Sequence, residues 1–297
     1  MIYRAAYVIP MDGRIIPDGE LLVRGAQIQQ VGSNLSASFP NEPVTDFGKS
    51  VLLPGFVNAH SHLDYTFTRR SLDGKSLWEW IESAAFNRAR KPDMEIVRLS
   101  ALLGAAELAL SGVTCVADSS FTGVVAEALQ AVGLRGIVYL ELFGQSAGPD
   151  YARVFQEKLA AARELQSKYP RLAGVGLSPH SVYTSNRGVL ELCAEACADG
   201  VPVAIHLAET AAEIDYLMNG AGPIADLRRR MGYEPMTAGM MPVEYLRNAG
   251  LLKEGVCLAH CVTLSPSEVE LIARSGAGVA HCPQSNAFLG CGIAPAA

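Results

Sequence analysis

The chain has 297 residues, of which 49% are hydrophobic and 18% are charged, and its net charge at pH 7 is −6. This composition is typical of a folded protein with a large buried core and excludes a disordered chain. The acidic balance excludes a protein that holds nucleic acid by charge, and no apolar run is long enough to cross a membrane.

The N-terminal stretch predicts neither a signal peptide nor a self-sufficient domain. Pro10, Asp12 and Gly13 interrupt the apolar core that a signal peptide would need, so we expect a cytoplasmic protein. Short strands separated by tight turns are predicted at residues 3–9, 20–23 and 27–31. Such a unit is too small to hold a core alone. We therefore assign residues 1–53 to a small β unit that forms part of a composite β-sandwich.

From residue 54 onward, predicted strands alternate with predicted helices. Alternation of this kind implies parallel strands joined by right-handed crossovers, and continuous apolar strands imply a sheet covered on its outer face. We assign residues 54–297 to a (β/α)8 TIM-barrel-type fold in which seven strands are present and the eighth is missing. The expected strands are 57–63, 113–117, 136–142, 174–177, 201–205, 256–259 and 278–280.

All six histidines lie at or just after the carboxyl ends of predicted barrel strands, where the strands of such a barrel converge on one mouth. Two of them form a His-x-His pair in the run VNAHSHL, and residues i and i+2 of a strand share one face. The alternative, a set of purely structural histidines, does not account for six at one mouth. The histidines are His60, His62, His180, His206, His260 and His281.

The histidine arrangement favours a divalent transition metal, because neutral imidazole binds such ions and three protein ligands leave a position open for water. Glu209 follows His206 by three residues, in the run AIHLAET. This spacing places its carboxyl group at the mouth, where it can carry protons to and from the substrate. The alternative is a charge at the N-terminus of the helix expected from Ala211.

Five runs, in this order and spacing, resemble the amidohydrolase superfamily: PGFVNAHSHL, LSPHSVYTSN, HLAET, LAHCVTLS and VAHCPQSNAFLGCGIAP. They are most similar to its branch of nucleoside and aminopurine deaminases and triazine hydrolases, including deaminases of S-adenosylhomocysteine, methylthioadenosine and aminodeoxyfutalosine. The resemblance implies one metal, zinc or iron, held by His60, His62 and His206. It also implies that Glu209 and His260 are catalytic and that His180 contacts the substrate. Under this resemblance, the residues that surround the ligands without binding the metal would be His281, Ser285 and Asn286.

The chain departs from this family pattern in two places. Relatives that act on methylthioadenosine carry an acidic residue for the ribose hydroxyls after a Trp-containing run, but residues 86–90 here contain no carboxylate. The family's final ligand, an Asp after the eighth strand, is also absent, because the sequence stops at Ala297. We therefore expect a C-terminally truncated chain with two unpaired strand edges and at most residual activity.

The leading hypothesis is a metal-dependent deaminase that acts on an amino-substituted N-heterocycle, an adenine-type nucleoside first. The alternatives are a hydrolase of cyclic amides or chloro-heterocycles on the same scaffold, and an inactive fragment. Trp78 is a candidate for stacking on an aromatic base, although helix packing explains it equally well. We expect a small-molecule substrate and neither nucleic acid nor membrane as a partner, and we keep a homo-oligomer as an open alternative.

Overall fold

The computed structural model describes residues 1–70, 73–89, 93–144 and 150–295, and it divides into the compact units Met1–Phe56 and Val57–Ala297. The first unit is a five-stranded sheet in which β1 pairs with β2 and β2 with β3, both antiparallel, while β4 and β5 pair parallel with β1. Its core is small, with Ile2, Leu22 and Leu35 fully or almost fully buried. The elements are β1 (Ile2–Val8), β2 (Ile16–Arg24), β3 (Gln27–Ser33), α1 (Leu35–Ser38), β4 (Val44–Asp46) and β5 (Val51–Leu52).

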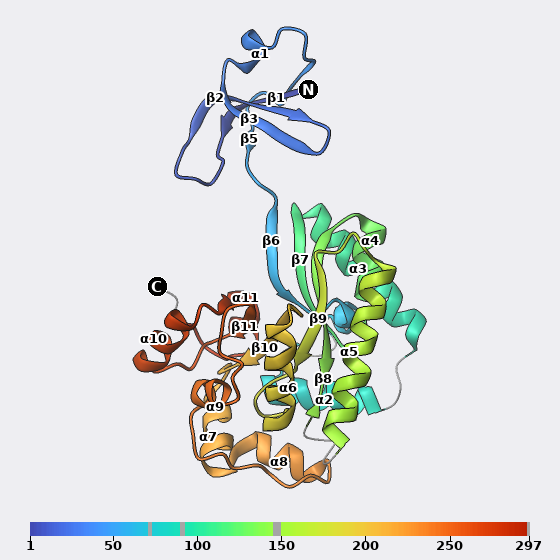
Figure 1. The fold of residues 1–297 in the computed structure, drawn as a ribbon, viewed down its shortest axis with the longest axis vertical. Helices are drawn as coiled ribbons and strands as arrows, with labels where there is room; N and C mark the ends of the chain where they lie inside the picture. Colours follow the sequence, from blue (N-terminus) through green and yellow to red (C-terminus); the bar gives the residue numbers. More distant parts are fainter. Residues whose placement is uncertain (71–72, 90–92, 145–149, 296–297) are drawn as a thin grey trace. The chain divides into compact units, whose positions relative to one another are not determined.

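The second unit is built on a seven-stranded sheet whose strands follow one another in chain order (Figure 1). Each pair from β7 to β12 is parallel. The predicted parallel barrel sheet with seven strands is therefore confirmed, and β6 and β12 lie at its two ends within the described residues. The strands are β6 (Phe56–Ser61), β7 (Val113–Ser120), β8 (Arg135–Leu142), β9 (Gly174–Pro179), β10 (Val203–Leu207), β11 (Val256–His260) and β12 (Gly278–Ala280).

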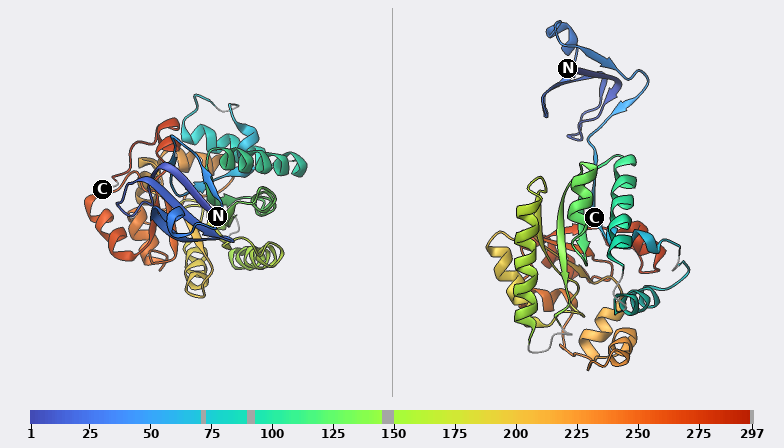
Figure 2. Two further views of the ribbon diagram at one scale, coloured as in Figure 1. Left: turned by 90° about the horizontal axis from the view of Figure 1, so that it is seen from above. Right: turned by 90° about the vertical axis from the view of Figure 1, so that its right-hand side faces the viewer.

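Helices surround the strands of this unit, as Figure 2 shows in the view from above. Helices α3 to α6 pack against strands β7 to β9, which buries the apolar faces of both layers. No helix in the described part of the chain is long and apolar enough to cross a membrane. The helical elements are η1 (Leu63–Thr68), α2 (Leu77–Ala89), α3 (Met94–Leu110), α4 (Val125–Val132), α5 (Tyr151–Lys168), α6 (Arg187–Ala198), α7 (Ala211–Asn219), α8 (Gly222–Arg230), α9 (Pro242–Asn248), α10 (Pro266–Ser275) and α11 (Pro283–Phe288).

The long connection between β10 and β11 holds two short helices after α7. It contains α8 and α9, each with a proline in its first turn. Ile224 and Leu227 of α8 are buried, as are Val243 and Leu246 of α9. This spacing of three residues places each apolar pair on one helix face. The glycines of the segment are typical loop signals, so the sequence pattern does not predict these two short helices.

Candidate metal and active site

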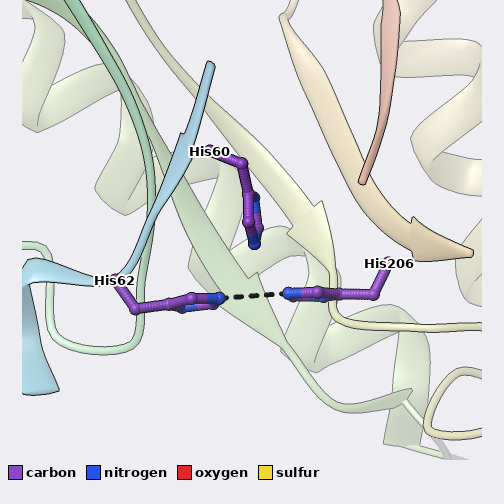
Figure 3. Close-up of side chains that lie close together, drawn as sticks. All are labelled: His60, His62 and His206. Carbon is purple, nitrogen blue, oxygen red and sulfur yellow. Dashed lines mark hydrogen bonds between the residues drawn. The ribbon is translucent and has the colours of Figure 1, made fainter. Parts of the chain in front are cut away.

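Five of the six histidines surround one cavity of about 630 Å³ at the carboxyl ends of the strands. His60 lies in β6 and His62 follows that strand by one residue, while His206 lies in β10. Figure 3 shows the rings of these three converging on a common point. His180 follows β9 and His260 ends β11, and both also line the cavity.

The ring nitrogens of the three converging histidines lie close enough together that they could hold one metal ion. Nε2 of His62 lies 3.1 Å from Nε2 of His206, and Nδ1 of His206 lies 2.5 Å from the carbonyl oxygen of His180. We assign the proton of His206 to Nδ1, which donates to that carbonyl and leaves the lone pair on Nε2. Nδ1 of His62 lies 3.6 Å from the carboxylate of Glu141. The ring nitrogens that face the common point can therefore offer a lone pair to a cation.

His60 completes the donor set. Its Nε2 is buried and has no hydrogen-bond partner among the described residues, and one ligand atom from each of the three histidines lies within 4.8 Å of the others. Burial and the neighbouring histidines lower the pKa values of His60 and His206 well below the usual 6.5. Both rings are therefore neutral at neutral pH. Three imidazoles that meet in this way fit a divalent transition metal.

Glu209 lies beside this donor set, two residues past the end of β10. Its side chain is almost fully buried, and burial, with a smaller contribution from Glu213, raises its pKa to about 8. Its Oε1 lies 3.4 Å from Nδ1 of His260, and the same nitrogen lies 2.8 Å from Oδ1 of Asn286. The carboxyl group and the imidazole thus form a buried pair at the floor of the cavity.

The loop that carries Glu209 is fixed by Glu213 from the first turn of α7. The Glu213 carboxylate accepts hydrogen bonds from the backbone N–H groups of Ala208 (3.0 Å) and Glu209 (2.6 Å). Ala208 has a left-handed φ of 51°, and its carbonyl oxygen accepts from the N–H groups of Val262 and Thr263 in the next loop. A strained backbone held by this many bonds keeps the Glu209 carboxyl group in one place.

Part of the cavity wall is aromatic and aliphatic, and the charged residues Arg69, Arg70 and Asp73 also line it. Trp80 of α2 lines it and meets Tyr65 edge to face at 5.8 Å between ring centroids. Trp78, the tryptophan proposed from the sequence, does not line the cavity and instead packs edge to face on Tyr183 at 5.6 Å. Residues two apart on a helix point about 200° away from each other, so only one of the two tryptophans can face the cavity. Further lining residues that sequence reasoning missed are Ser61, Tyr65, Thr66, Thr68, Arg69, Arg70, Asp73, Leu77, Ile81, Glu141, Tyr183, Cys282, Phe288 and Leu289.

The remaining predicted residues are distributed unevenly. His180 lines the cavity, with its Nδ1 3.1 Å from Oγ1 of Thr184. Ser285 also lines the cavity, whereas Asn286 is buried behind His260. His281 is exposed and is not a lining residue. The side chains of residues 86–90, where the family's ribose contact would be expected, lie outside the described residues.

Residues 51–297 match the model of the amidohydrolase family. The chain belongs to the amidohydrolase family. A 5-methylthioadenosine/S-adenosylhomocysteine deaminase of Nitratidesulfovibrio vulgaris is 32% identical over 303 residues, which cover 99% of this chain and 64% of that protein. The chain thus spans slightly less than two thirds of this relative. Family membership confirms the resemblance found in the sequence motifs.

Two solved structures show the same fold. The aminofutalosine deaminase of Helicobacter pylori, in complex with methylthio-coformycin, has a TM-score of 0.85 and 22% identity, with 99% of this chain and 72% of that chain covered. The atrazine chlorohydrolase of Arthrobacter aurescens TC1, complexed with zinc, has a TM-score of 0.81 and 23% identity, with 99% and 68% covered. At these identities, the likeness identifies the amidohydrolase barrel.

Proposed function

We propose that this amidohydrolase is a metal-dependent deaminase of an adenine-type nucleoside. The observation that carries the proposal is the convergence of three imidazoles next to the buried carboxyl group of Glu209. In this proposal His60, His62 and His206 hold one divalent metal, zinc ahead of iron. A metal held there would supply Lewis acidity, which lowers the pKa of water and raises its nucleophilicity at neutral pH.

Glu209 is the proposed proton carrier. Its raised pKa, about 8, means that the carboxyl group holds a proton near neutral pH and can give it to a ring nitrogen of the heterocycle. The carboxylate formed in that step can then take a proton from the attacking water and pass it to the leaving amine. The second proton of that water returns to the carboxylate as the carbonyl forms. His260, held by Asn286, faces the same position and stabilises the negative charge that develops on the attacking oxygen.

The cavity supports a planar heteroaromatic substrate. Its volume of about 630 Å³ is in the range of sites for small molecules, and its wall presents Trp80 and Tyr65 for contact with an aromatic ring. The name of the similar deaminase from N. vulgaris supports 5′-methylthioadenosine and S-adenosylhomocysteine as the first candidates. The likeness to atrazine chlorohydrolase supports a second candidate, displacement of a chloro substituent from a triazine.

The test is metal loading followed by release of ammonia. The zinc-loaded protein is incubated with 5′-methylthioadenosine, S-adenosylhomocysteine, guanine and atrazine, and ammonia and chloride are measured. We expect ammonia from the adenine nucleosides, and we expect His206→Ala to lose both zinc and activity. Glu268→Gln is the control, because it changes the buried capping-box carboxylate of α10, which does not line the cavity. Release of chloride without ammonia would replace deamination with the second candidate.

A further inference from the structure

His62 lies just outside the hydrogen-bonded ladder of the seven-stranded sheet. It follows Ser61, the last residue of β6, so no ladder pairing fixes it directly. Moreover, β6 is the end strand of the seven-stranded sheet, and β7 is its one sheet neighbour among the described residues. A ligand in this position needs another anchor, because a residue just beyond the end of a strand is not held by the hydrogen bonds of the ladder.

The anchor is Asp118, a fully buried residue of β7. Its Oδ2 accepts one hydrogen bond from Oγ of Ser61 at 2.7 Å and another from the backbone N–H of Leu63 at 2.8 Å. These two donors lie immediately before and immediately after His62 in the chain. A single carboxyl oxygen therefore fixes the backbone on both sides of the ligand.

A second carboxyl group, on the segment that follows His62, accepts hydrogen bonds from the end of β7 and the residues after it. Asp64, also buried, accepts hydrogen bonds from Oγ of Ser120, from the backbone N–H of Thr122 and from Oγ1 of Thr122, at 3.0 to 3.1 Å. Asp118 reaches from β7 to the segment around His62, while Asp64 reaches from that segment to the end of β7. The two contacts together resist both translation and rotation of the segment.

We propose that Asp118 is a positioning residue for the metal site. It holds the backbone on both sides of His62 and so keeps Nε2 of His62 close to Nε2 of His206. The inference rests on the proposed function only in that His60, His62 and His206 bind the metal. It does not depend on which reaction follows. Groups behind metal ligands typically contribute about 10-fold to 100-fold to metal affinity, because a misplaced ligand must be reoriented each time the metal binds.

The hydrogen bonds of Asp118 are asymmetric, and the asymmetry gives a sharp test. Both donors meet Oδ2, whereas Oδ1 has no hydrogen-bond partner among the described residues. An asparagine can place its carbonyl oxygen at the position of Oδ2 and its amide nitrogen at that of Oδ1. Burial, with the nearby Asp64 carboxyl group, also raises the pKa of Asp118 well above its usual value, which shifts the group toward the form that a neutral amide resembles.

The experiment measures the zinc affinity of the 297-residue chain by competition with a chromogenic chelator, and it records the visible spectrum of the cobalt(II)-substituted protein. We expect Asp118→Ala to bind zinc about 10-fold to 100-fold more weakly and to change the cobalt spectrum. We expect Asp118→Asn to bind like the wild type. Ser61→Ala removes one of the two donors and should weaken binding less than Asp118→Ala. Glu268→Gln should lower the free energy of unfolding and leave zinc affinity unchanged.

Each outcome of these measurements either supports or overturns the proposed role of Asp118. Wild-type affinity in Asp118→Ala, or equal losses in Asp118→Ala and Asp118→Asn, would overturn the proposal. If Asp118→Ala does not fold, Ser61→Ala decides, since unchanged zinc affinity there contradicts the anchor and weaker affinity supports it. Wild-type protein that binds zinc but releases no ammonia overturns the proposed deamination and leaves this inference standing. Wild-type protein that binds no metal overturns both.

Discussion

The carboxyl group of Glu209 is buried beside three imidazoles, and this position determines what its replacement does. Glu209→Gln preserves the shape of the side chain but cannot carry a proton, so we expect turnover to fall by about 10²-fold to 10⁴-fold. Metal content should stay the same, because Glu209 is not one of the three proposed ligands. Ammonia release and elemental analysis of the same preparation check both statements. Near-normal turnover would show that Glu209 serves only as a charge near the N-terminus of α7.

The raised pKa of Glu209 also predicts how the stability of the metal-free protein depends on pH. The carboxyl group ionises near pH 4.5 in the unfolded chain but near pH 8 in the fold, so the unfolded state binds fewer protons between these values. From pH 6.5 to 8 the free energy of unfolding should therefore fall, by up to about 1.4 kcal/mol per pH unit for one such group. The lowered pKa values of His60 and His206 have the opposite effect, but they act below pH 6.5.

Urea unfolding of the metal-free protein at several pH values measures this slope. Glu209→Gln should flatten it in part, since Glu213, whose pKa is raised to about 7, still contributes. A slope that is the same in wild type and variant would contradict the assignment of the effect to Glu209.

The two tryptophans of α2 allow a matched comparison of a residue that lines the cavity with one that packs in the core. Trp80 lines the cavity and is not among the side chains packed against the main core, so Trp80→Ala should raise the KM for an aromatic substrate and lower the free energy of unfolding less than Trp78→Ala does. Trp78 packs against Tyr183 and the core, so Trp78→Ala should lower the free energy of unfolding and change KM less. Steady-state kinetics and thermal melts of both variants separate the two roles, and the reversed pattern would place Trp78 at the substrate.

At the scale of elements, the turn from β10 into α7 is rigid because Glu213 holds two of its backbone N–H groups. Glu213→Ala leaves both groups buried without an acceptor, at a cost of about 1 to 3 kcal/mol for each. We expect a lower melting temperature and slower turnover with unchanged metal content, because Glu209 loses its fixed position. A control at the start of α10, Glu268→Gln, should lower stability while turnover per folded molecule stays constant.

The elements also show what the sequence could and could not predict. Strands such as Gly278–Ala280 and the helix that begins at Ala211 were predicted closely, because continuous apolar runs and helical periodicity are local signals. The short helices α8 and α9 were not, since Pro and Gly within them resemble loop signals. The convergence of the histidines follows from barrel topology alone. By contrast, the contacts of Asp118 and Glu141 depend on side-chain directions between neighbouring strands, and no local pattern reports those.

At the scale of the whole molecule, metal binding and stability are linked. A metal that binds the folded chain and not the unfolded chain stabilises it by about 2.7 kcal/mol at a free concentration of 100 times Kd. We therefore expect zinc to raise the melting temperature of the wild type and a chelator to lower it again. His206→Ala should melt at the same temperature with and without zinc. A zinc-dependent shift that persists in this variant would place the metal elsewhere.

The proposed ligands His62 and His206 lie 144 residues apart in the chain. Strand β6, which ends just before His62, is separated in the sheet from β10, which carries His206, by β7, β8 and β9. Closing a chain segment of this length costs conformational entropy before any contact across it forms. The coordination sphere can therefore exist only after five consecutive strands have taken their places, which makes it a late event on the folding path. Interactions that are absent from the transition state mainly retard unfolding. Zinc would thus lengthen the lifetime of the folded chain far more than it would hasten its formation.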